Sequence, residues 1–411
     1  MRKNIYRFLS VFWLIHVMVL ISCGMPATSF TNPSEAPSNS VADSCIPPLY
    51  GDFSYPISSE SVDMKYPGIN MSVLPPAPWD IEVSLPEIPG IESTEYSSIE
   101  MLQARSLNDA IEIWVRVSVG FEEQAYFLVY RTDTEEWKLI PERINLLIVD
   151  KDGTLWGSYD SKPVPSNDSM IKKFNEQTNT FEKTSARMPI SPQQGQENNY
   201  YGQTLLDNNG IFWMLIPEQG IYKFNPITSD LKKVFDLSFH FRSAKIDSNG
   251  IIYLLVYNEF TKDGGFEIQS LLYRYDTNTG DSNNQNLRYL LEPYPLPAKN
   301  LFLDSRGRIW LDSIAYRDEA GIWRQIQRSP LFVSPIREVY SDYRYKTAEV
   351  VLESSDKRLW FLHLNNGMIF LNPDKGEWCW FTTYQSNIVE DVDHNLWMIA
   401  DGKLYKYPLQ P

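Results

Sequence analysis

The sequence predicts an all-β protein, on three observations. Aromatic residues, which favour strands, are abundant: 12 Trp, 24 Tyr and 20 Phe among 411 residues. Turn-forming Asp-x-x-Gly segments recur along the chain, each followed by an apolar residue and then a Trp or Tyr. These marker aromatics lie 37 to 57 residues apart, close to the roughly 40 to 50 residues of one propeller blade. The seven markers, Trp114, Trp156, Trp213, Tyr253, Trp310, Trp360 and Trp397, predict a seven-bladed β-propeller.

The first 22 residues predict a signal peptide. Basic residues open the chain, and the apolar run 8–21 follows; its 14 residues are fewer than the roughly 20 needed to span a bilayer as a helix. The run ends in LISC, residues 20–23, which resembles a bacterial lipobox. We therefore expect Cys23 to carry acyl chains, two or three of which anchor a protein stably. The expected location is extracytoplasmic, at the outer membrane or the cell surface.

Residues 23–49 are rich in Pro, Ser and Asn without apolar periodicity, which predicts a flexible tether. A single propeller domain is expected over residues 50–411. Two further cysteines, Cys45 and Cys379, follow Cys23. In an oxidising exterior they can pair and pin the N-terminal segment to the late part of the chain, and two unpaired thiols are the alternative.

Each repeat begins with a short apolar run, typical of a buried strand, and then the Asp-x-x-Gly segment. Asp accepts hydrogen bonds from the backbone ahead of it and Gly tolerates a positive φ, so the segment predicts a tight reversal. The complete copies are Asp150/Gly153, Asp207/Gly210, Asp247/Gly250 and Asp304/Gly307, and the degenerate copies are Asn108/Ile111, Ser354/Lys357 and Asp391/His394.

The rest of each repeat predicts three more strands. A second strand carries the marker aromatic, and a third ends in patterns such as GIYKFNP, residues 220–226. An aromatic seven residues later, as from Phe174 to Phe181, indicates a fourth. Four antiparallel strands make a blade, and stacked blades bury each other's faces. No fourth strand follows Tyr407, so we expect an N-terminal strand from residues 50–89 to close the last blade.

The repeat pattern also carries a family resemblance. Asp-x-x-Gly-x-Ile/Leu-Trp followed by Gly-Ile/Leu-Tyr-Lys/Arg-Phe/Tyr-Asn/Asp-Pro, over about residues 97–408, resembles the propeller repeats in periplasmic sensor regions of bacterial two-component regulators and in many exported lipoproteins. The resemblance implies a propeller that senses, binds or scaffolds. Those sensors continue into a membrane helix and a kinase, whereas this sequence ends at Pro411. We expect no catalytic signalling domain, and a partner of a separate sensor kinase is one alternative.

Binding is expected on one face of the propeller. In an up-and-down blade the Asp-x-x-Gly turns and the third-to-fourth turns share one face, here called the tight-turn face. The long segments 157–170, 184–201, 258–269, 282–299 and 329–347 fall on the other, the long-loop face. Aromatic and Arg side chains there favour contacts with a protein or glycan, although the rings can instead pack onto the propeller rim. The candidate binding residues are Tyr200, Tyr201, Tyr289, Tyr294, Tyr340, Tyr343, Arg344 and Tyr345.

A second candidate site is the mouth of the central channel. The positions eleven residues before each marker aromatic lie near the expected start of an innermost strand. Polar side chains there can bind a small ligand or form an ordinary solvated lining. The candidates are Gln103, Asn145, Arg242, Lys299 and Glu349.

Enzymatic activity is not expected, and no catalytic residue is assigned. The repeats also resemble those of streptogramin lyases in outline, which use a catalytic His beside metal-binding Glu; His240 and His363 are the residues on which a lyase or hydrolase alternative depends. Sialidase-like propellers place Asp two residues before the turn Gly, whereas here it lies three before. Glycosidase chemistry needs two opposed carboxylates, and no spacing singles out such a pair.

No cofactor or metal is expected. No His lies at metal-ligand spacing from another His or a Cys. The turns DKDG and DNNG resemble the opening of calcium loops, which makes calcium a minor alternative, but each turn runs straight into an apolar strand. The formal charge of −15 disfavours nucleic acid. We expect a monomer that is anchored to a membrane through Cys23 and binds an unidentified protein or glycan.

Overall fold

The computed structural model describes the strands of a propeller and the turns between them. The residues described are 45–46, 54–56, 81–89, 91, 96–107, 110–119, 124–142, 144, 146–158, 169–186, 202–262, 265–287, 298, 300–312, 315–326, 349–363, 367–381, 388–400 and 402–409. The expected signal peptide and Cys23 lie outside them. By its backbone contacts the chain divides into two units, Met1–Ser40 and Val41–Pro411. Every described strand belongs to the second unit. Within the described ranges, no helix has the length and apolarity to cross a membrane.

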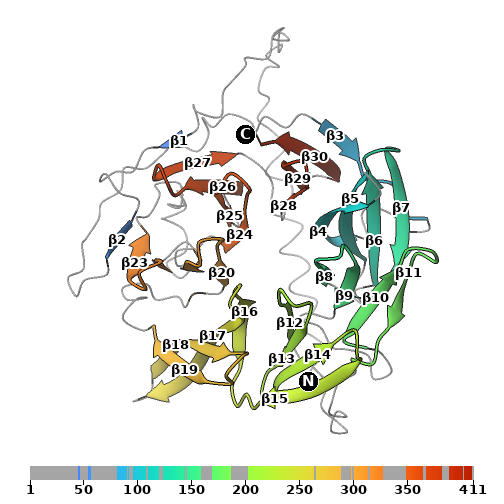
Figure 1. Ribbon diagram of the computed structural model, residues 1–411. Helices are drawn as coiled ribbons and strands as arrows, with labels where there is room; N and C mark the ends of the chain where they lie inside the picture. The colour runs from blue at the N-terminus through green and yellow to red at the C-terminus, as the bar shows by residue number, and fades with distance from the viewer. Residues whose placement is uncertain are drawn as a thin grey trace, which may run out of the picture. The chain divides into compact units, whose positions relative to one another are not determined.

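Seven antiparallel sheets form the blades, which confirms the predicted fold class (Figure 1). Blade 1 consists of β4 (Tyr96–Leu107), β5 (Ala110–Val119), β6 (Gln124–Arg131) and β7 (Glu136–Pro141). Blade 2 consists of β8 (Leu146–Val149), β9 (Leu155–Ser158), β10 (Ile171–Asn175) and β11 (Thr180–Lys183). Blade 3 consists of β12 (Gln203–Leu206), β13 (Phe212–Ile216), β14 (Gly220–Asn225) and β15 (Asp230–Phe235). Blade 4 consists of β16 (Phe241–Ile246), β17 (Ile251–Lys262), β18 (Gly265–Asp276) and β19 (Ser282–Asn286).

The last three blades combine strands from both ends of the chain. Blade 5 contains β20 (Leu301–Leu303), β21 (Ile309–Leu311), β22 (Ala315–Arg317) and β23 (Trp323–Ile326). Blade 6 contains β24 (Glu349–Glu353), β25 (Leu359–His363), β26 (Gly367–Asn372) and β27 (Glu377–Phe381). Blade 7 contains β28 (Ile388–Glu390), β29 (Asn395–Ala400) and β30 (Lys403–Pro408). The first strand of blade 7, β28, contacts β4 of blade 1, so the ring is closed.

The N-terminal segment supplies the closing strand and two more. β3 (Ile81–Ser84) pairs with β30 and becomes the fourth strand of blade 7, as predicted. β1 (Cys45–Ile46) and β2 (Ser54–Pro56) were not predicted; they add fifth strands outside β27 and β23. The segment thus pairs with the outer edges of three consecutive blades, which satisfies backbone groups on those edges. β1 also begins within the segment that the sequence assigned to the tether.

The register of β1 bears on the cysteines. Cys379 is disulfide-bonded, and its side chain is buried. Cys45 lies directly opposite Cys379 in the ladder between β1 and β27. Opposed positions of an antiparallel pair lie within the Cα separation that a disulfide bridges. The register therefore supports a Cys45–Cys379 bond over two unpaired thiols.

Each of the seven gaps between blades holds one apolar cluster, and each marker aromatic belongs to the cluster it shares with the following blade. Trp213 of blade 3 packs with Ile252 and Leu254 of blade 4, and Trp397 of blade 7 packs with Ile113 and Val115 of blade 1 across the closure. The other markers occupy the equivalent clusters. This arrangement confirms the predicted stacking of blades through their large aromatic residues.

Two segments predicted as loops contain strands instead: residues 282–286 of the expected connection 282–299 form β19, which pairs with β18, and residues 258–269 belong to a hairpin. Residues 258–269 were expected to form a long connection, but β17 and β18 continue through them as a paired ladder from Ile251↔Asp276 to Lys262↔Gly265. β16 pairs with β17 only as far as Val256, so the hairpin extends six residues beyond the rest of blade 4. The alternation of apolar and polar residues in FEIQ, residues 266–269, is a strand pattern within the segment expected to be a loop.

The buried marker aromatics predict a stability experiment. Trp213→Ala removes a side chain that is 2% exposed, so we expect the free energy of unfolding of the full-length protein in detergent to fall by about 3 to 5 kcal/mol. Chemical denaturation followed by circular dichroism measures the loss. A loss below about 1 kcal/mol would place the indole outside the core, contrary to the packing described above.

Candidate functional site

The recurring Asp of each complete turn links the turn to the marker aromatic. In blade 3, Oδ1 of Asp207 accepts the backbone N–H groups of Asn209 and Ile211 at 2.8 and 2.9 Å. Oδ2 accepts the indole N–H of Trp213 at 2.9 Å. Asp150, Asp304 and Asp391 bond their own indoles in the same way, at 2.8, 2.8 and 2.6 Å. One carboxylate therefore shapes the turn and satisfies the only polar atom of a buried Trp side chain.

In blades 4 and 6 either the aromatic or its acceptor is a different residue. In blade 6 the hydroxyl of Ser354 accepts the Trp360 indole N–H at 3.0 Å. In blade 4 the Tyr253 hydroxyl lies 3.5 Å from Oδ2 of Asp247, and burial, with Asp247 adding a smaller effect, raises the pKa of Tyr253. At the positions of the missing turn glycines, Lys357 and His394 adopt positive φ angles of 68° and 62°. The turn geometry is thus kept in blades 6 and 7, whereas in blade 1 the predicted Asn108/Ile111 turn is replaced by a tighter hairpin in which Leu107 pairs with Ala110.

Blade 1 replaces the turn carboxylate with a buried ion pair. Oε2 of Glu112 accepts the Trp114 indole N–H at 3.3 Å and two hydrogen bonds from Arg105 at 2.9 and 2.7 Å. A second carboxylate, that of Glu176 in blade 2, accepts a hydrogen bond from Nη1 of Arg105 at 2.7 Å. Arg105 is 3% exposed, so its charge is compensated by these acids and by the Trp114 ring 5.5 Å away.

A cation lies over the marker ring in most blades. In blades 2, 3 and 7 it is the third-strand Lys directly opposite the Trp, as Lys223 is opposite Trp213 with a nitrogen-to-centroid distance of 5.6 Å. In blade 5 the register partner of Trp310 is Tyr316, and Arg308 from the turn takes the place of the Lys at 5.3 Å. The recurring Lys/Arg of the third strand is therefore a structural element of the repeat.

These bonds explain the calcium-like turns. Both carboxylate oxygens of Asp150 and Asp207 accept N–H groups of their own repeat. A calcium loop instead directs its carboxylate oxygens at the ion. Among the described residues, no group of three or more His, Cys, Asp or Glu is placed to hold a metal.

The candidate binding residues of the long-loop face lie outside the described residues. Tyr200, Tyr201, Tyr289, Tyr294, Tyr340, Tyr343, Arg344 and Tyr345 all belong to this set. The strands that flank them are described: β11 precedes and β12 follows the first pair, and β23 and β24 flank residues 327–348. Because neighbouring strands are antiparallel, these connections join strand ends on the face opposite the Asp-x-x-Gly turns.

The candidate channel residues do not occupy equivalent register positions in their strands. Glu349 pairs with Leu362 at the start of β24, and Arg242 lies beside a bulge near the start of β16. Gln103 instead pairs with Trp114 itself, since the β4–β5 hairpin continues to Leu107↔Ala110 and shifts the register by three residues. Asn145 and Lys299 lie outside the described residues. Gln103 therefore lies opposite its marker aromatic, whereas Glu349 lies opposite a residue two positions beyond its marker. The structure does not bring the described candidates to equivalent positions along the channel.

Of the two candidate catalytic His residues, only His240 has a side chain that the structure describes. His240 pairs with Glu218 at 3.0 Å, and both side chains are about two-thirds exposed (70% and 67%). The side chain of His363 lies outside the described residues. Within the described part of the chain, His240 therefore forms a solvent-exposed pair with a single carboxylate.

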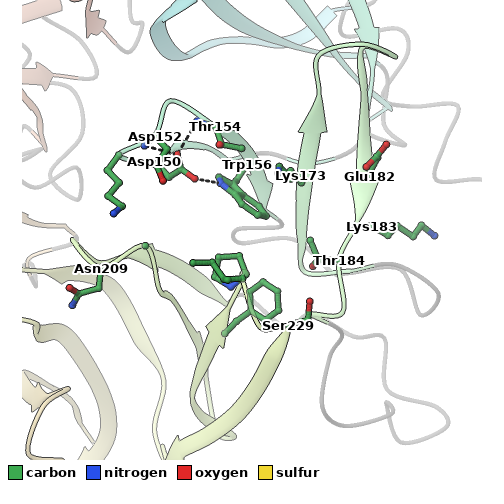
Figure 2. A pocket seen from close by; sticks show the side chains of 15 residues that line it. Asp150, Asp152, Thr154, Trp156, Lys173, Glu182, Lys183, Thr184, Asn209 and Ser229 are labelled. Atoms are coloured by element: carbon green, nitrogen blue, oxygen red, sulfur yellow. Dashed lines mark hydrogen bonds between the residues drawn. The ribbon is translucent and has the colours of Figure 1, made fainter.

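A cavity of 490 Å³ opens on the tight-turn face between blades 2 and 3 (Figure 2). We call it the blade 2–3 slot; it is lined by residues 150–152, 154, 156, 173, 182–184, 209–210, 224, 226–227 and 229. One wall is a row of register partners across blade 2, Trp156, Lys173 and Glu182. The other wall comes from the two turns of blade 3. The slot was not predicted, because its residues belong to the ordinary repeat; the apolar Ile227 at a turn tip was the available signal.

Comparison with known proteins shows the fold alone. No protein-family model and no curated protein matches the sequence. The solved structure of YCF48 bound to a D1 peptide is similar, with a TM-score of 0.52 and 12% identity over 82% of this chain and 98% of that chain. The extracellular domain of a putative hybrid two-component system of B. thetaiotaomicron gives 0.48 and 12%, over 77% of this chain and 40% of that one, so the match spans two fifths of its length. A chain of the mitotic checkpoint complex gives 0.49 and 9%, over 86% and 99%.

The bond from the turn Asp to the indole predicts a measurable coupling. Asp207→Ala leaves the buried N–H of Trp213 and two turn N–H groups without their acceptor, so we expect a loss of about 1 to 3 kcal/mol in the free energy of unfolding. In a Trp213→Phe background the same change should cost less, because no indole N–H remains to be satisfied. A double-mutant cycle measures the difference. Equal losses in both backgrounds would show that Asp207 acts on the turn only.

Proposed function

We propose that the protein is an extracytoplasmic binding or scaffold protein, anchored by lipid on Cys23, whose propeller presents the long-loop face to a protein or glycan. The observation that carries this proposal is a difference between the two faces of the propeller. The turn carboxylates described on the tight-turn face are used by their own repeats. The long connections of blades 2 to 6 join strand ends on the opposite face.

A closed ring supports the role of a rigid scaffold. Apolar clusters fill all seven gaps between blades, and strands from the N-terminal segment cover the outer edges of blades 5, 6 and 7. Loops that project from such a frame keep their relative positions at little entropic cost, which favours binding. The similar solved structure of YCF48 holds a bound D1 peptide. A binding role for this chain is consistent with that example of the fold.

The binding face predicts the outcome of site-specific crosslinking in the native cell. A photo-crosslinking amino acid at Tyr343, which the sequence predicts to lie on the long-loop face, should give an adduct with one defined protein or glycan. The same amino acid at Thr134, an exposed turn residue on the tight-turn face, is the matched control and should give little of that adduct. The adducts are identified by mass spectrometry. Adducts from position 134 and none from 343 would contradict the assignment of the face.

The lipid anchor predicts a change in fractionation. Cys23→Ala removes the expected acylation site, so the variant should move from the membrane to the soluble extracytoplasmic fraction, because a removed anchor leaves no apolar attachment. Cys45→Ala, which keeps Cys23, is the matched control and should stay with the membrane. Immunoblots of the two fractions measure the distribution. Full membrane retention of the Cys23 variant would refute lipid anchoring at that residue.

A further inference from the structure

The blade 2–3 slot contains two lysines that form no ion pair with a carboxylate of the described residues. Lys151 and Lys173 line it, and both are exposed. Lys173 lies over the Trp156 ring at 5.8 Å, and neither Lys forms an ion pair with a carboxylate among the described residues. In a chain with 52 acidic and 37 basic residues, unpaired lysines in a cavity are unusual. They leave two positive charges available to a ligand.

The acidic groups of the slot are mostly engaged. Both oxygens of Asp150 accept N–H groups of its own turn and the Trp156 indole. Glu182 accepts a 2.6 Å hydrogen bond from the side-chain amide of Asn175. Asp152 is the one carboxylate of the slot without such a donor in the described residues. Lys183 also lines the cavity, but its side chain extends away from Trp156 (Figure 2).

The opposite wall is apolar and hydrogen-bonding. Ile227, at the tip of the third-to-fourth turn of blade 3, is 90% exposed, and Pro226 precedes it. Asn209 lies on the neighbouring turn, on the side of the slot away from Lys173 (Figure 2). An exposed isoleucine beside unpaired cations offers one contact for an apolar side chain and another for an anion.

The aromatic residues argue for a peptide rather than a sugar. Trp156 and Phe224 are only 6% and 1% exposed, so neither presents a ring face for a sugar to stack on. The apolar surface that is available, at Ile227, is aliphatic. An extended peptide supplies a carboxylate, an apolar side chain a few ångströms away and backbone groups for the Asn209 amide.

We propose that the blade 2–3 slot binds an acidic peptide segment of a protein partner. A Glu or Asp side chain lies between Lys151 and Lys173, and an adjacent apolar side chain packs on Pro226 and Ile227. This site is on the tight-turn face, so it is separate from the long-loop face and does not depend on the function proposed for that face. Two sites on opposite faces would let the propeller connect two partners.

The test uses full-length protein in detergent and a fluorescent, end-capped heptapeptide of alternating Glu and Leu. Fluorescence anisotropy measures the dissociation constant. The same peptide with Gln in place of Glu, and an oligomer of uronic acid that carries carboxylates on sugar rings, are the two other ligands. We expect the acidic peptide to bind at least about fivefold more tightly than either, and more weakly as salt rises, because exposed ion pairs are screened.

Four variants connect the binding to the slot. Lys151→Gln with Lys173→Gln should weaken the acidic peptide about fivefold to tenfold. Ile227→Ser should weaken it about threefold or more. Asp152→Asn should tighten it, because it removes a repulsive charge. Lys223→Gln is the matched control: Lys223 covers Trp213 in blade 3 as Lys173 covers Trp156 in blade 2, but it lies outside the slot and should change binding less than twofold.

The outcomes are separable. Charge-dependent binding that these slot variants change in the stated directions, with Lys223→Gln neutral, supports the proposal. Each of three results overturns it: equal binding of the Gln peptide, preference for the uronic acid oligomer, or equal effects of the Lys151/Lys173 double substitution and the Lys223 substitution. Circular dichroism of every variant shows whether the fold is kept. Crosslinking through position 343 is unaffected by these variants, so failure here is distinguishable from failure of the long-loop face.

Discussion

The hydrogen bond between a turn carboxylate and the indole of the same repeat is the interaction on which the propeller depends. It fixes the reversal between the first two strands and allows a Trp to be buried between blades without an unsatisfied N–H, as Asp207 does for Trp213. Because the indole faces the next blade, a local turn is coupled to the packing of two sheets. Repeated around the ring, this coupling makes stacking specific.

The degenerate repeats show which part of this interaction is required. Ser354 replaces the carboxylate and keeps the bond to Trp360. Glu112 does so from the second strand, and Arg105 then balances its charge. What persists is an acceptor for the buried indole, whereas the glycine and the aspartate are replaceable. The physical constraint is therefore polar satisfaction inside an apolar gap, and the repeat motif is its commonest solution.

Residues that recur in the repeat have structural roles, which separates them from candidate functional residues. The Lys of the third strand covers an indole in three blades, so its presence alone marks no site. Lys173 differs from Lys223 because Lys173 lines a cavity between blade 2 and the turns of blade 3. Function on a repeat scaffold thus arises where one gap departs from its neighbours, on either face.

The sequence by itself determined the number of blades, the four-stranded pattern, the seven inter-blade aromatics and the closure by an N-terminal strand. These follow from spacing and periodicity, which are local. Only the tertiary structure decided that Asp207 and Trp213 are bonded, that β1 and β2 cover blades 6 and 5, that Gln103 lies opposite Trp114, and that a slot opens beside Lys173. Each depends on register or on the fit between blades, and residues far apart in sequence set both.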